Sequence, residues 1–222
     1  MKLMTAPLSP TVFVVDDYAP VRSAVSRQLH AAGFAVAAFA SPEKFLAQYD
    51  PHTPGCLVLD LDIPAVNGLE LQRVLARKGN VMPIIFLTGQ GDIPSCVEAM
   101  KRGASDFLTK PVNDEDLLAA VRAAIEKDRA FRREQTEVSE IRARLATLTP
   151  REREVLEHVV TGKLNRQIAG DLGTAEQTVK VHRAHLMQKM RVRSVAELVR
   201  LTERCGIRGS VQWSSVGNQI AD

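Results

Sequence analysis

Carboxylate, hydroxyl and amino side chains stand at the ends of four short apolar segments of this 222-residue chain. Segment 11–16 ends in Asp16 and is followed by Asp17, and segment 56–60 ends in Asp60. Segment 83–88 ends in Thr88, and segment 106–109 is followed by Lys110. Clustered carboxylates repel one another unless a cation neutralises them, and oxygen ligands favour a hard ion such as Mg²⁺. A carboxylate nucleophile beside Mg²⁺, a hydroxyl and a lysine is the set that acyl-phosphate formation requires.

The pattern of predicted strands and helices places these side chains close together in the fold. Near-continuous apolar segments separated by helices indicate a parallel sheet covered on both faces, a doubly wound α/β fold. The carboxyl ends of all strands then lie on one rim, where such folds carry their sites. The expected strands are 11–16, 35–40, 56–60, 83–88 and 106–109, and the expected helices are about 19–33, 42–50, 66–78, 93–102 and 114–130.

Residues 11–127 resemble the receiver domain of two-component response regulators. The matching motifs are VVDD, LVLDLDIPAVNGLEL, IIFLTG and SDFLTKP. The resemblance implies a flavodoxin-like five-stranded domain that accepts a phosphoryl group on Asp60 from a sensor histidine kinase. It also implies Mg²⁺ as cofactor, held by the acidic pair Asp16 and Asp17, by Asp60 and by the main-chain carbonyl of Asp62. Thr88 and Phe107 would form the switch pair, and Lys110, before a cis bond to Pro111, would contact the phosphoryl group.

The sequence allows two interpretations of Asp62. It is either a solvated loop carboxylate or a group that alters water access and charge near the acyl phosphate and so sets its lifetime. The spacing Asp60-Leu61-Asp62 also resembles the DxD motif of haloacid-dehalogenase-type phosphohydrolases, a remote alternative. Those enzymes need an acidic pair after a later strand, whereas here the pair follows the first one.

The second half of the chain predicts a small all-α domain. Thr149 and Glu152 form a capping box with Pro150 at the first helical position, and Ser194 and Glu197 form a second box. Helices 167–172 and 175–190, joined by Gly173 and an N-capping Thr174, indicate a helix-turn-helix. The expected organisation is a receiver domain at 1–127, a charged helical linker at 128–147, a four-helix DNA-binding domain at 148–207 and a disordered tail at 208–222.

The longer of these helices has one face suited to a DNA groove. Val179, Leu186 and Met190 lie on one stripe at helical spacing and predict the buried side. Small and amide side chains point away, flanked by cations, which suits base edges in a major groove and phosphates beside it. The candidate DNA-binding residues are Gln177, Lys180, Val181, His182, Arg183, Ala184, Gln188 and Lys189. Net charge agrees, since it is −2 for residues 1–127, +1 for 128–147 and +4 for 148–222.

Residues 148–205 resemble the LuxR-type DNA-binding domain of FixJ/NarL-like regulators. The sequence of the receiver region is most similar to the FixJ branch of that family. The resemblance implies base reading by Lys180 and Val181, with His182, Arg183 and Lys189 near the backbone. It implies a phosphorylation-dependent transcriptional regulator, not an enzyme, that dimerises when phosphorylated. Its partners would be a sensor histidine kinase, double-stranded promoter DNA and RNA polymerase. The alternative is a phosphate-independent DNA-binding regulator whose receiver serves only as a dimerisation scaffold.

Composition agrees with a location in the reducing cytoplasm and no membrane. The three cysteines have no metal-ligand spacing, and no apolar run approaches the roughly 20 residues of a membrane helix.

Overall fold

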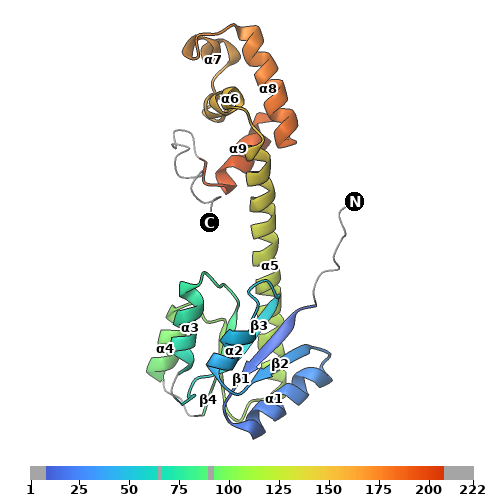
Figure 1. Ribbon diagram of the computed structural model, residues 1–222, viewed down its shortest axis with the longest axis vertical. Coiled ribbons are helices and arrows are strands. Elements are labelled where there is room, and N and C mark those ends of the chain that lie inside the picture. Colours follow the sequence, from blue (N-terminus) through green and yellow to red (C-terminus); the bar gives the residue numbers. More distant parts are fainter. Residues whose placement is uncertain (1–8, 65–66, 90–92, 208–222) are drawn as a thin grey trace. The chain divides into compact units, whose positions relative to one another are not determined.

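A computed structural model describes residues 9–64, 67–89 and 93–207 (Figure 1). The chain divides into two compact units, residues 1–132 and residues 133–222. The predicted tail at 208–222 lies outside the described residues. Within the described part, no helix has both the length and the apolar character needed to cross a membrane.

The first unit is built on five strands, β1 (Thr11–Val15), β2 (Ala35–Phe39), β3 (Gly55–Asp60), β4 (Ile84–Thr88) and β5 (Asp106–Thr109). The strand order is β2-β1-β3-β4-β5, and all neighbours pair in parallel. This confirms the predicted doubly wound sheet. It also confirms the strand positions, because the expected and observed ends differ by no more than one residue.

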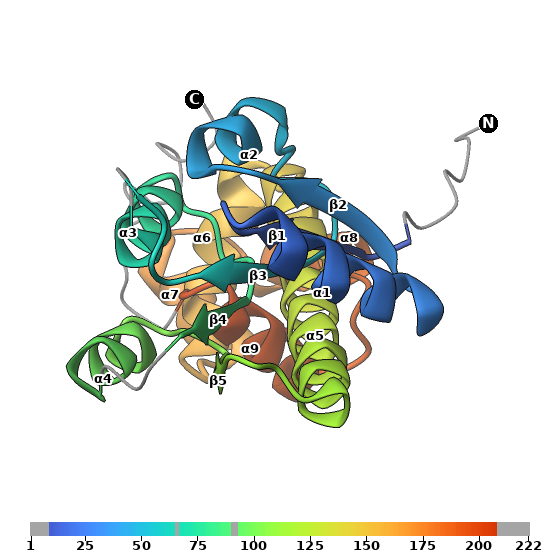
Figure 2. The same ribbon diagram turned by 90° about the horizontal axis from the view of Figure 1, so that it is seen from below.

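Helices cover both faces of this sheet (Figure 2). Successive strand residues point to opposite faces, which divides the core in two. One core holds α1 (Ala19–Ala31) and the first half of α5 (Asp114–Ala146) against side chains such as Val14, Val58 and Ile85. The other holds α2 (Pro42–Gln48), α3 (Gly68–Arg77) and α4 (Ile93–Lys101) against side chains such as Val15, Leu59 and Phe86.

A partly buried ion pair within α5 is hydrogen-bonded to the amino end of β3 and to the loop before it. The Asp128 side chain is 1 % exposed and accepts from the backbone N–H of Gly55 at 2.9 Å and from Nε of Arg132 at 2.8 Å. Arg132 also donates to the carbonyls of His52 and Thr53, at 3.1 and 2.8 Å. Gly55 is required here, because a Cβ would lie 1.8 Å from the Thr11 oxygen. These contacts fix the loop before β3 on α5.

The second unit packs four short helices on the end of α5. They are α6 (Pro150–Val160), α7 (Asn165–Asp171), α8 (Glu176–Met190) and α9 (Val195–Arg204). Their shared core includes Val155, Ile168 and Leu198, together with Ile141 and Leu145 of α5. The last turns of α5 are therefore built into this core. The predicted domain limits at 127 and 148, with residues 128–147 as a separate linker, stay a prediction.

The helix starts in this unit are capped unequally. The predicted Thr149–Glu152 capping box is present. The predicted Ser194–Glu197 box forms only in part: the Ser194 side chain accepts from the Glu197 N–H, but the Glu197 side chain accepts from the N–H of Arg193 and not from that of Ser194. The prediction that Thr174 caps the long helix is wrong. The cap position is Ala175, which has no side-chain acceptor, because the turn extends one residue further before the helix begins at Glu176.

Leu164, at the cap position of α7, gives a stability prediction. Its backbone N–H already donates to Oε1 of Gln167 at 2.9 Å, but its side chain cannot cap and is 69 % exposed. Leu164→Ser completes a capping box and should stabilise the second unit by about 1 kcal/mol. The calorimetric transition of that unit should then move up by roughly 5 °C. Leu164→Ala is the matched control, and equal melting of the two variants would refute the capping argument.

Candidate functional site

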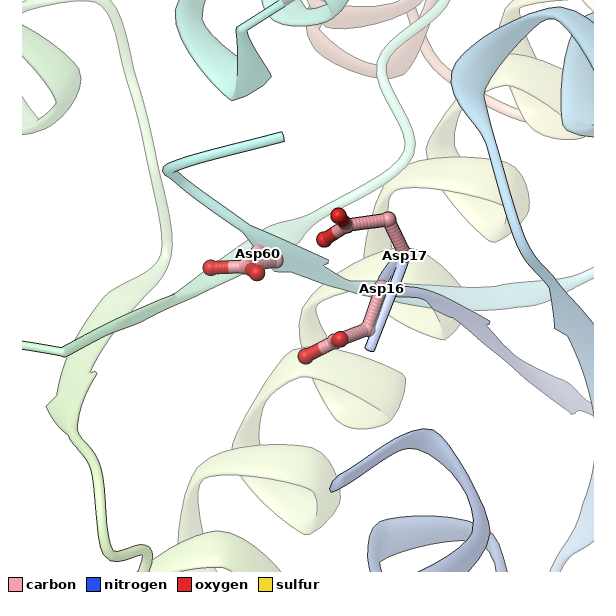
Figure 3. Close-up of side chains that lie close together, drawn as sticks. All are labelled: Asp16, Asp17 and Asp60. Atoms are coloured by element: carbon pink, nitrogen blue, oxygen red, sulfur yellow. The ribbon is translucent and has the colours of Figure 1, made fainter. Parts of the chain in front are cut away.

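Three carboxylates gather at the carboxyl rim of the sheet (Figure 3). Asp16 follows β1, Asp17 comes next, and Asp60 is the last residue of β3. One carboxylate oxygen from each lies within 4.8 Å of the others. Asp16 and Asp60 are 1 % and 5 % exposed, whereas Asp17 is exposed to solvent. The parallel pairing of β1 with β3 brings these residues together, as the sequence predicts.

Lys110 joins this cluster from the other side. Its Nζ lies 2.8 Å from Oδ2 of Asp16 and 2.9 Å from Oδ2 of Asp60. Its backbone N–H donates to the Thr88 carbonyl at 2.6 Å, which fixes the turn after β5, and the Lys110–Pro111 bond is cis, as expected. Burial by itself lowers the pKa of Lys110, but the bonds to the two carboxylates raise it above its ordinary value. The lysine therefore stays charged.

The carboxylate cluster is also suitable for a hard divalent cation. Burial, with the nearby Asp60 carboxylate, raises the pKa of Asp16 despite the opposing effect of Lys110. Three carboxylates against one ammonium leave excess negative charge at a site whose donors are all oxygens. Mg²⁺ is commonly bound by one or two carboxylates together with phosphate oxygens and water. The donor set therefore fits Mg²⁺, with exposed Asp17 on the solvent side.

Thr88 and Phe107 occupy neighbouring strands beside the cluster. Thr88 ends β4 and is fully buried, one residue beyond the Asp60–Leu87 pairing. Phe107 lies in β5 and is half-buried, with its ring centroid 6.5 Å from that of Phe86. Thr88 therefore lies on the strand next to Asp60, and Phe107 lies on the strand beyond it. Their role as a switch pair stays a prediction.

Asp62 lies outside the carboxylate cluster in the described residues. Its side chain is exposed, and its backbone N–H donates to Oδ1 of Asp60 at 3.3 Å. The expected role of its carbonyl as a metal ligand stays a prediction.

Sequence reasoning missed Arg22, which holds the acidic pair. Its Nη1 donates to the carbonyls of Asp16 at 2.7 Å and Asp17 at 3.2 Å. Its place in the first turn of the helix after the pair is the signal that could have identified it.

Gly68 is a second supporting residue, and it gives a prediction. A Cβ at this position would lie 2.6 Å from the Asp60 carbonyl oxygen and 3.0 Å from Cε1 of Phe86. Gly68→Ala should therefore displace the backbone at Asp60 and destabilise the first unit by about 1–3 kcal/mol, the usual cost of overpacking. Urea unfolding followed by circular dichroism measures this. Gly89→Ala is the control, because a Cβ there meets no atom within 4 Å, and equal midpoints would contradict the steric argument.

The candidate DNA-binding residues on α8 divide into two groups. Those exposed to solvent are Gln177, Lys180, Val181, Ala184 and Gln188. His182, Arg183 and Lys189 are half-buried. Arg183 donates to Oδ1 of Asn165 at 2.8 Å, and Lys189 pairs with Glu152, contacts that a helical projection does not reveal. Val179, Leu186 and Met190 are buried, as predicted.

Two sequence families match the chain. The response regulator receiver domain matches residues 12–122, and the luxR family of bacterial regulatory proteins matches residues 146–202. The first match contains the carboxylate cluster and the second contains α8.

Similar proteins cover nearly the whole chain. Nodulation protein W of Bradyrhizobium diazoefficiens is 47% identical over 196 residues, 88% of this chain and 86% of that protein. Transcriptional regulatory protein FixJ of Azorhizobium caulinodans is 43% identical over 201 residues, 90% of this chain and 95% of that protein. Among solved structures, response regulator StyR is similar with a TM-score of 0.80 and 44% identity, covering 88% of this chain and 99% of that one.

Proposed function

The chain belongs to the response-regulator family, with a receiver domain and a LuxR-type DNA-binding domain, and we propose that phosphorylation of Asp60 by a sensor histidine kinase controls its binding to promoter DNA. The two matched domains make the protein a transcriptional regulator, and its relative FixJ bears that description in its name. The observation that carries the proposal is the contact of one lysine, Lys110, with both Asp60 and Asp16.

In the proposed transfer, Asp60 is the nucleophile. One of its carboxylate oxygens attacks the phosphorus of the kinase phosphohistidine, so that an O–P bond forms while the N–P bond breaks. The electron pair of the broken bond returns to the imidazole nitrogen. Lys110 stabilises the charge on the phosphoryl oxygens, and the Thr88 hydroxyl donates a hydrogen bond to one of them. Mg²⁺, when held by Asp16, Asp17, Asp60 and the Asp62 carbonyl, supplies further positive charge there.

The phosphoryl group then acts on the surface of the receiver. Thr88 moves toward the new oxygens, and Phe107 follows into the space that Thr88 leaves, so that a small local change biases a two-state surface. The altered surface favours a receiver dimer. Two DNA-binding domains then read paired half-sites through α8 and, with RNA polymerase, activate transcription.

Analytical ultracentrifugation with and without beryllofluoride and Mg²⁺ tests this proposal. We expect a Mg²⁺-dependent shift from monomer to dimer that is absent in Asp60→Asn. Beryllofluoride binding without a shift would reject dimerisation as the signal. A dimer of equal affinity in every condition, and in the variant, would favour a phosphate-independent regulator with the receiver as scaffold.

Asp62 should influence the lifetime of the phosphorylated state. Its exposed carboxylate follows Asp60 by two residues, so its charge can alter the access of attacking water to the acyl phosphate. Asp62→Asn should slow autodephosphorylation about threefold, well below the 10²–10⁴-fold of a fully positioned general base. Loss of phosphate from the isolated protein measures the rate, with Glu126→Gln as an exposed control. An unchanged rate would identify Asp62 as a solvated loop carboxylate.

A further inference from the structure

We propose that Lys189 serves DNA binding as a positioning residue: it holds α8 on the start of α6 through Glu152 and does not contact a DNA phosphate. This inference rests on the proposed use of α8 as the recognition helix. It gives Lys189 a different role from the phosphate contact that the sequence suggests.

The geometry commits the ammonium group to the protein. Nζ of Lys189 lies 2.6 Å from Oε2 of Glu152 and 3.2 Å from the carbonyl oxygen of Thr147. A lysine has three donors, so two of them are used within the second unit. Both partners lie at the junction of α5 and α6. The lysine therefore joins the last turn of α8 to that junction.

The Glu152 side chain is held in place, so it could not move with Lys189 if the lysine turned toward DNA. Its side chain is 4 % exposed, and the same Oε2 accepts from the Thr149 backbone N–H at 2.8 Å in the capping box. Burial by itself raises the pKa of Glu152, but the bonds from Lys189 and Thr149 lower it below its ordinary value. If Lys189 turned toward a phosphate, a buried carboxylate would lose its charged partner, which is unfavourable.

A second cation holds the same end of the helix. Nη1 of Arg144 donates to the carbonyl of Met190 at 3.4 Å, and the last carbonyls of a helix need such partners. The exposed cation of α8 is placed differently. Lys180 pairs with Glu176, one turn away on the same helix, at 3.1 Å and on the surface. Lys180 can therefore turn to DNA at small cost, whereas Lys189 cannot.

Glu152→Gln separates the two roles by the sign of its effect. Glutamine keeps the capping box but removes the charge that Lys189 binds. If Lys189 positions α8, the full-length variant should bind DNA about threefold to tenfold more weakly, although it has lost a negative charge. If Lys189 contacts a phosphate, freeing it should leave binding equal or tighter.

Lys189→Met adds a second measurement, the salt dependence of DNA binding, which changes only if Lys189 contacts a DNA phosphate. The slope of log K against log salt falls by about 0.9 for each lost phosphate contact. A positioning role leaves the slope at the wild-type value while affinity drops, and the double variant with Glu152→Gln should bind no more weakly than either single one. A slope reduced by about 0.9, or additive losses, would overturn the proposal. Circular dichroism confirms that every variant is folded at the temperature used.

The probe is a duplex selected by the phosphorylated wild-type protein from a random-sequence pool. Lys180→Ala is the control for the proposed function, since it removes an exposed cation without touching Glu152. If Lys180→Ala weakens binding and Glu152→Gln does not, the positioning role of Lys189 is wrong, but recognition of DNA through α8 still stands. If no duplex is enriched, or Lys180→Ala has no effect, recognition through α8 is rejected, and this inference with it.

Discussion

Replacing Asp128 with alanine should destabilise the receiver domain by about 3 kcal/mol, because it breaks a partly buried ion pair and leaves a buried N–H without an acceptor. Its carboxylate is almost fully buried and accepts from Gly55 and Arg132. Alanine leaves the Gly55 N–H without an acceptor and frees the Arg132 guanidinium from the site that orients it toward the loop carbonyls. Calorimetry of the full-length protein should show the receiver transition about 10 °C lower.

Two variants control this experiment. Glu126→Ala removes an exposed carboxylate one half-turn earlier, whose ion pair with Arg129 lies on the surface, and should change stability by less than about 0.5 kcal/mol. Asp128→Asn keeps one acceptor for Gly55 but loses the charge, so its transition should fall between those of the wild type and Asp128→Ala. A loss below about 1 kcal/mol in Asp128→Ala would show that the clamp adds little to the fold.

Asp128 also shows where sequence reasoning ended. In the sequence it interrupts the apolar seam of the long helix, which favours a solvated position. Its partner Gly55 is 73 residues away and contributes only a backbone N–H. Since every residue type except proline carries that donor, no pattern of side chains could indicate the pairing.

The linker shows the same limit for apolar residues. Val138 and Leu145 recur at roughly helical spacing among many charges, which is typical of a solvated connecting helix. The structure buries Leu145 and packs Val138 against the core of the second unit. Helical spacing identifies a face but not the element that covers it, and the covering helices come later in the chain.

The carboxylate site could be predicted much further. Parallel strands bring their carboxyl ends to one rim, so Asp16, Asp60 and Lys110 follow from topology alone. The contacts of Arg22 and Lys189 could not be predicted, because a helical projection fixes the direction of a side chain and not its partner. The sequence thus predicts which reactive groups gather at the rim, but it does not predict the contacts that hold the surrounding side chains in place.

Lys110 should control the chemistry of that rim. We expect Lys110→Gln to reduce the rate of Asp60 phosphorylation by acetyl phosphate about 10²–10³-fold, the usual effect of removing one preorganised donor to a developing negative charge. The ammonium lies within 3 Å of oxygens on both Asp16 and Asp60, so it stands where the phosphoryl group of the proposed transfer would arrive. A phosphate-affinity gel measures the phosphorylated fraction over time.

The same substitution should strengthen Mg²⁺ binding, measured by isothermal titration calorimetry. Without the ammonium, Asp16 and Asp60 lose the charged partner that lies within 3 Å of each, and the cluster of three carboxylates attracts a divalent cation more strongly. Opposite changes in phosphorylation and metal affinity separate loss of charge stabilisation from collapse of the site, which would weaken both. Lys127→Gln, on the exposed side of α5, should change neither. A phosphorylation rate within twofold of wild type would assign Lys110 to stability alone and leave Thr88 and the cation to stabilise the transferred group.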